Sequence, residues 1–98
     1  MPEYSLSFPV DFEEYQSEWE SKGWFRGATL VVSGERYLLS FYDPARLHQE
    51  IADELQKQVV FAEPNLLVIA TVTRENIEKA VEFFVQSGNL GWLTPQSH

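Results

Sequence analysis

The chain has 98 residues, 44% of them hydrophobic and 14% aromatic. This length suits one compact domain with one core and is too short for two domains of ordinary size. Fifteen acidic and seven basic residues give a formal net charge of -8, which opposes binding to nucleic acid or to an anionic membrane surface. The sequence therefore predicts neither of these partners.

Cysteine is absent from the sequence, which removes thiolate nucleophiles, cysteine-based zinc sites and cysteine-ligated iron–sulfur clusters. The first residues, Met1 to Ser5, lack the basic region and apolar run of a signal peptide. Apolar runs such as Leu66 to Ala70 are too short to span a bilayer. We therefore expect a cytoplasmic protein.

The first predicted elements are a strand and a helix. Residues Tyr4 to Phe8 alternate apolar and polar side chains, which is the period of a half-buried strand. A helix is expected over Phe12 to Lys22, with Asp11 as its cap and Glu14 completing a capping box. Gly23 would end this helix in the left-handed conformation.

A β-hairpin follows, formed by Trp24 to Ser33 and Arg36 to Asp43. With Gly34 and Glu35 as a two-residue type II′ loop, the expected register pairs Val32 with Tyr37, Leu30 with Leu39, Ala28 with Phe41, and Arg26 with Asp43. The opposite face would then carry Phe25, Gly27, Thr29, Val31, Leu38, Ser40 and Tyr42.

The second half of the chain begins with a helix that Asp43 caps and Pro44 opens. Its buried stripe is expected to consist of Leu47, Ile51 and Leu55. Two strands should follow, Val59 to Ala62 and Leu66 to Val72, separated by a turn at residues 63–65. The second strand is apolar on both faces, which is typical of a central strand.

A last helix is capped by Thr73 and ends at Gly88, with a core stripe of Ile77, Ala80, Val81, Phe84 and Val85. We expect one domain over residues 1–98, with residues 89–98 as a C-terminal tail whose order the sequence leaves open.

The predicted fold class is α+β, a two-layer sandwich with an antiparallel sheet and helices on one face. Its element order is the βαββαβ order of ferredoxin-like proteins with an extra C-terminal helix. A loose likeness between Tyr37–Leu55 and Asn65–Val85 supports an alternative, in which the chain consists of duplicated ββα units.

Residues that could carry catalysis are few. His48 has no second histidine at metal-ligand spacing and is interpreted as an ordinary histidine near the helix stripe. Glu50, Asp53 and Glu54 are interpreted as a solvated helix face rather than a metal site. No cofactor and no metal are expected, and the chain is predicted to be non-catalytic.

One local group of residues is a candidate binding site. The expected hairpin register brings Trp24, Arg26, Asp43 and Arg46 to one end of the sheet. A structural pair of Arg26 with Asp43 is the favoured interpretation. In the alternative, Arg26 or Arg46 binds a carboxylate or phosphate with the help of helix N–H groups, and Trp24 forms a wall.

Apolar residues exceed what one helical layer needs, which indicates an interface with a second copy of the chain. The candidate interface residues are Phe25, Val31, Leu38, Tyr42, Phe83 and Trp92. In the alternative, the C-terminal tail folds back over the same surface.

Acidic residues are concentrated at the N-terminal end, where residues 1–22 carry a net charge of -5, which would steer a basic partner toward this end. We therefore predict a non-catalytic acidic protein-interaction module, a homodimer that also accepts a basic protein partner. Two alternatives stay open: a small-molecule-binding or catalytic ferredoxin-like dimer with an apolar pocket, and a structural subunit of a larger complex.

Overall fold

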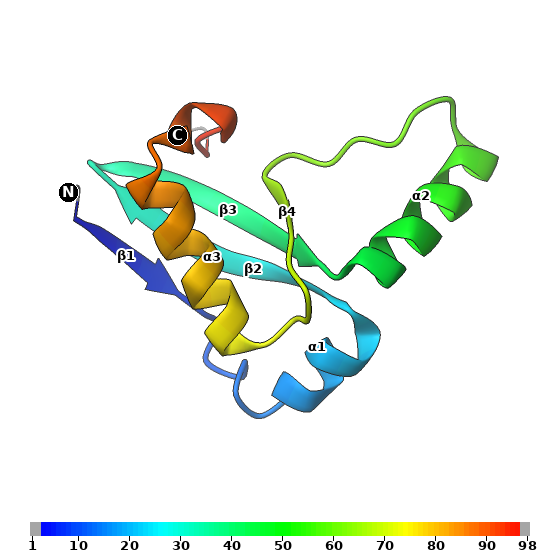
Figure 1. Cartoon of the computed structure of the whole chain (residues 1–98), viewed down its shortest axis with the longest axis horizontal. Helices are drawn as coiled ribbons and strands as arrows, with labels where there is room; N and C mark the ends of the chain where they lie inside the picture. The colour runs from blue at the N-terminus through cyan, green and yellow to red at the C-terminus, as the bar shows by residue number, and fades with distance from the viewer. Residues whose placement is uncertain (1–2, 97–98) are drawn as a thin grey trace.

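A computed structural model describes residues 3–96 and shows an α+β fold with a four-stranded mixed sheet (Figure 1). The strands are β1 (Tyr4–Ser7), β2 (Trp24–Val32), β3 (Glu35–Tyr42) and β4 (Leu66–Val68). The helices are α1 (Gln16–Lys22), α2 (Pro44–Lys57), α3 (Arg74–Gln86) and the 3-10 helix η1 (Asn89–Trp92). The ends of the expected domain, residues 1–2 and 97–98, lie outside the described residues.

The sheet order is β1-β2-β3-β4, so each strand lies beside its neighbour in sequence. The first two pairings are antiparallel, whereas β4 runs parallel to β3. The expected all-antiparallel sheet is therefore wrong, because α2 carries the chain back to the start of a parallel strand. The ferredoxin-like arrangement is not confirmed either, since α1 joins two antiparallel neighbours and only β3, α2 and β4 form a parallel crossover.

The hairpin forms as expected, but its register differs by two residues. Its loop is Ser33-Gly34, with φ values of 52° and 81°, and two positive φ angles are characteristic of a type I′ turn. Leu30 therefore pairs with Tyr37 instead of Leu39, and Val32 pairs with Glu35. Because the shift is even, the core-facing side chains of this part of the hairpin keep their face.

A β-bulge at Gly27 changes the faces at the other end of the hairpin. The register shifts between Arg26 and Ala28, and Gly27 has a φ of 122° that side chains disfavour. The bulge turns Phe25 into the core, where it is 1% exposed. The predicted role of Phe25 as an interface residue is therefore wrong.

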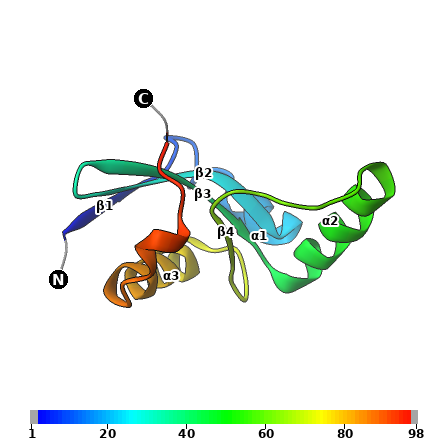
Figure 2. The same ribbon diagram turned by 90° about the horizontal axis from the view of Figure 1, so that it is seen from above.

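The core lies between the sheet and α3, which covers one face (Figure 2). Thr73 caps α3 as predicted, because its side chain accepts a hydrogen bond from the N–H of Asn76. Ile77, Val81 and Val85 are buried at helical spacing. They pack with buried sheet residues that include Leu30, Leu39 and Phe41.

The first helix begins later than expected, at Gln16. Residues 11–15 form turns, and the residue before the helix, Tyr15, makes no side-chain cap, so the predicted capping box at Asp11 and Glu14 is wrong. The cause is tertiary packing of Phe12, which is buried with its ring 4.7 Å from the rings of both Phe8 and Phe25. This burial competes with the local helical preference.

The segment between α2 and β4 is also corrected. Residues 58–65 form no strand, and Val59 and Val60 are exposed. The expected strand over Leu66 to Val72 is reduced to β4, which lies at the edge of the sheet rather than in its centre. Duplicated ββα units are therefore not present, because the second unit lacks its first strand.

Helix α2 projects from the sheet and forms one end of the molecule, whose longest dimension is 41 Å (Figures 1 and 2). None of its residues is buried. Leu47 and Ile51 are half-buried and Leu55 is 50% exposed, so the predicted buried stripe is wrong. We call these three residues the α2 stripe.

The C-terminal tail is partly ordered against the sheet. Leu93 is buried, and the N–H of Gln96 donates to the carbonyl of Arg36. The side chain of Asn65 joins this tail to the sheet. Its Nδ2 donates hydrogen bonds to the carbonyls of Leu38 and Thr94, and its Oδ1 accepts one from the N–H of Thr94. Within residues 3–96, no helix is both long and apolar enough to cross a membrane.

Candidate functional site

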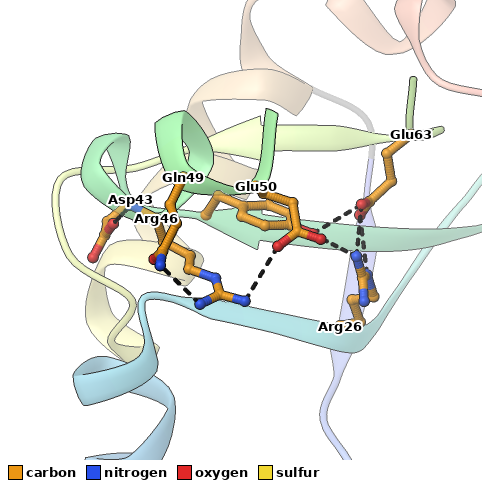
Figure 3. Close-up of polar contacts among 7 residues, drawn as sticks. Arg26, Asp43, Arg46, Gln49, Glu50 and Glu63 are labelled. Atoms are coloured by element: carbon orange, nitrogen blue, oxygen red, sulfur yellow. Dashed lines mark hydrogen bonds and ion pairs between the residues drawn. The ribbon is translucent and has the colours of Figure 1, made fainter. Parts of the chain in front are cut away.

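Arg26, Tyr42 and Glu63 form a hydrogen-bonded group that we call the Arg26 cluster (Figure 3). Arg26 donates from Nε and Nη2 to the two carboxylate oxygens of Glu63, at 3.2 and 2.8 Å. It also donates to the hydroxyl of Tyr42, which in turn donates to Glu63 at 2.9 Å. Each of the three side chains therefore has a hydrogen-bond partner, although the side chain of Arg26 is half-exposed.

Three separate segments position this cluster. Arg26 precedes the bulge in β2, Tyr42 ends β3, and Glu63 lies in the return segment between α2 and β4. The guanidinium of Arg26 lies 5.3 Å from the ring of Trp24 and 5.7 Å from the ring of Tyr42. Two aromatic faces thus hold the cation while its N–H groups reach the carboxylate.

The electrostatics of the cluster favour a charged pair beside a neutral tyrosine. Burial and the neighbouring Glu63 raise the pKa of Tyr42 to about 12. Burial alone would raise the pKa of Glu63, but hydrogen bonds to its charged form, led by that of Arg26, lower it overall. The hydrogen bond to Glu63 raises the pKa of Arg26. The cluster is therefore an internally neutralised ion pair.

The predicted pair of Arg26 with Asp43 is wrong, because the register places Arg26 opposite Ser40. Asp43 instead caps α2 by accepting a hydrogen bond of 2.7 Å from the N–H of Arg46. The side chain of Arg46 pairs with Glu50 at 3.2 Å (Figure 3). The four residues expected at one binding site therefore belong to two networks, one at Glu63 and one at the start of α2.

Glu63 was missed because it is far from Arg26 in the sequence. Its position depends on the path of residues 58–65, which carry no periodic pattern. One signal could have indicated Glu63. Arg26 lies on a strand, and a partly buried cation there needs a carboxylate from some part of the chain.

A hollow of about 450 Å³ lies beside the cluster. It is lined by Arg26, Gly27, Leu38, Leu39, Ser40, Glu63 and Pro64. The lining is mostly apolar with charge at one rim, and its volume lies within the range of small-ligand sites. We call it the Leu38 hollow.

The hollow belongs to the sheet face opposite α3, which we call the open sheet face. Strand alternation and the bulge place these residues on it: Ser5, Ser7, Arg26, Thr29, Val31, Arg36, Leu38 and Ser40. Leu38 is 47% exposed. Among the described residues, the helices leave this face uncovered (Figure 2).

The predicted interface residues do not form one patch. Tyr42 is only 1% exposed and belongs to the Arg26 cluster, so its predicted interface role is wrong. Val31 and Leu38 lie on the open sheet face. Phe83 and Trp92 are 68% and 78% exposed, and they come from α3 and η1.

Two of the acidic residues near the N-terminal end form surface ion pairs. Glu13 pairs with Arg74, and Glu18 lies 4.0 Å from Lys22. Within residues 3–96, no three His, Asp or Glu side chains come together as a potential metal site. His48 is exposed on α2.

Comparison with protein families, characterised proteins and solved structures found no match to this chain. The function of this chain is therefore inferred from its fold and from the geometry of its surfaces.

Proposed function

We propose that this chain is a non-catalytic protein-interaction module that presents α2 to another polypeptide. The observation that carries the proposal is the α2 stripe, which faces no core of its own. An amphipathic helix ordinarily buries its apolar face against another element. Here that face is left for a partner.

Two anchors support the presentation of α2. The N–H of Asp43 donates to the carbonyl of Gly23 at 2.8 Å, where the helix starts. The return segment is attached to the sheet by Glu63, through Arg26 and Tyr42. Because the start of the helix and the return segment at Glu63 are fixed, less conformational entropy is lost when α2 binds a partner.

The exposed apolar residues extend beyond the helix. Val59 and Val60 lie just after Gln58, the residue that caps the end of α2, and both are exposed. Together with Leu55 they give three exposed apolar side chains within six residues of the chain. A concentration of exposed apolar side chains is typical of interaction sites.

A second candidate function is supported by the Leu38 hollow. Its volume of about 450 Å³ and apolar lining suit a small apolar ligand. The polar rim is less favourable to binding, because Arg26 is already neutralised by Glu63. We therefore place ligand binding second.

Native mass spectrometry of the protein purified gently from its own host tests these functions. The proposal expects an added mass of at least several kilodaltons, either a second copy or another chain. The substitution Leu55→Asp should remove this added mass, while Gln56→Asp on the polar face of the helix should retain it.

An added mass of a few hundred daltons that survives Leu55→Asp would favour ligand binding instead. A bare single chain at every protein concentration would count against both functions.

A further inference from the structure

Two apolar surfaces of this chain are left uncovered by its other described elements. One is the α2 stripe, in which the side chain of Leu55 is 50% exposed. The other is the open sheet face with the Leu38 hollow. In a parallel crossover the helix normally packs on the sheet that it connects, so each surface lacks the kind of cover that the other could provide.

The start of α2 and the segment that follows the helix are each attached to the sheet. Gly23 packs so tightly at the start of α2 that a Cβ there would lie 2.6 Å from a carboxylate oxygen of Asp43. After the helix has ended, Glu63 and Asn65 attach the return segment to β2 and β3. Between these attachments α2 projects away from the sheet (Figure 1).

Charge favours a second copy as the occupant of the open sheet face. Arg26 on this face is already paired with Glu63, whereas Arg36, two residues before Leu38 on the same strand face, makes no ion pair among the described residues. On α2, Glu50 is paired with Arg46, whereas Glu54 borders the stripe at helical spacing from Ile51 and has no basic partner among the described residues. Glu54 beside the apolar stripe therefore complements Arg36 beside the Leu38 hollow.

Twofold symmetry would cover both surfaces in both copies. If α2 of one copy packs on the sheet of a second copy, the twofold axis places α2 of the second copy on the sheet of the first. One closed contact then covers both surfaces of both copies.

Resting on the proposed function, we propose that two copies of this chain form a symmetric dimer by exchanging α2. The α2 stripe of each copy packs on the open sheet face of the other. Leu55 approaches Leu38 of the second copy, and an apolar side chain fills the Leu38 hollow.

The absence of cysteine makes a cross-linking test unambiguous. The double variant Leu38→Cys, Leu55→Cys is treated with a short bismaleimide and analysed by denaturing mass spectrometry. Both sites are half-exposed, so the substitutions should preserve folding. The matched control is Leu38→Cys, Gln56→Cys, which moves the helix thiol to an exposed polar position.

The proposal expects a covalent dimer of twice 11.3 kDa, formed several-fold more efficiently by the first pair than by the control. Sedimentation velocity of the unmodified chain should show a dimer that dissociates on dilution. Equal cross-linking by both pairs would overturn the assigned contact.

The other outcomes separate this inference from the proposed function. A cross-link within one chain, with both thiols consumed at a mass near 11.3 kDa, would show α2 closed on its own sheet and would overturn both proposals. A monomer with both thiols free would overturn the dimer and leave the α2 stripe available to a different protein.

Discussion

Glu63 holds the Arg26 cluster together, because it accepts hydrogen bonds from both Arg26 and Tyr42. Its pKa is lowered below the ordinary value of 4.5. A carboxylate with a depressed folded-state pKa stabilises the fold above its unfolded pKa, and this stabilisation is lost as the pH falls through the folded value. The contribution of Glu63 is therefore complete at neutral pH and disappears in acid.

We predict that Glu63→Gln lowers the free energy of unfolding by about 1 kcal/mol at neutral pH, a value discounted for the exposure of Arg26. The difference from the parent chain should shrink as the pH falls below 4.5. Urea denaturation at several pH values measures it, with Glu78→Gln on the surface of α3 as the control. A difference independent of pH would contradict the charged pair.

Tyr42 provides a spectroscopic test of the same cluster. Its pKa is raised to about 12 by burial and by Glu63. The neutral phenol therefore stabilises the fold fully below pH 10.0, and this contribution is lost as the pH rises toward 12. Tyr42→Phe should remove the last step of the phenolate absorbance titration, and superimposable titrations near pH 12 would contradict the assignment.

Contacts between residues close in the sequence were predicted better than contacts between distant ones. The caps at Asp43 and Thr73 depend on neighbours three residues away, and both were predicted correctly. The partner of Arg26 depends on the hairpin register and on the path of a distant segment. The two-residue shift at the turn and the one-residue bulge at Gly27 together place Arg26 opposite Ser40, and Glu63 replaces Asp43 as its partner.

At the scale of elements, α2 and α3 share a sequence pattern and differ in packing. Both are capped and carry an apolar stripe. Only α3 contributes buried residues, among them Ile77 at 0% exposure. The pattern identifies a helix and its apolar face, but it does not identify which surface covers that face.

This difference predicts unequal costs for equivalent truncations. Ile77→Ala should lower the free energy of unfolding by about 2–5 kcal/mol, because it leaves a cavity in the core. Leu55→Ala, at 50% exposure, should cost the monomer less than about 1 kcal/mol. Denaturation at a protein concentration low enough to exclude association measures both, and a large cost for Leu55→Ala would place α2 against its own core.

The strands were predicted where hydrophobic alternation met turn residues. Both strands of the hairpin appear, whereas Val59 to Ala62 does not form a strand. Strand propensity is expressed only when a neighbour supplies hydrogen bonds, and β4 with the C-terminal tail already occupies the edge of β3. The competition between these segments involves the whole sheet, so a local pattern does not decide it.

At the scale of the whole molecule, the net charge of -8 acts against association of two copies. Exposed ion pairs at the edge of a contact contribute only about 0–1 kcal/mol, so they do not dominate this long-range repulsion. Burial of the α2 stripe and the Leu38 hollow must supply the affinity, and apolar burial is insensitive to moderate salt.

We therefore expect that added salt does not weaken the dimer. Raising ionic strength from about 0.01 M to 0.15 M shortens the Debye length from about 30 Å to about 8 Å, which screens the repulsion between the two acidic copies. Sedimentation equilibrium across this range should show a dissociation constant that falls modestly or stays constant. A basic partner bound to the acidic N-terminal end would behave in the opposite way, because salt would screen an attraction. A steep loss of self-association with salt would mean that charge pairs, rather than the apolar surfaces of α2 and the sheet, hold the two copies together.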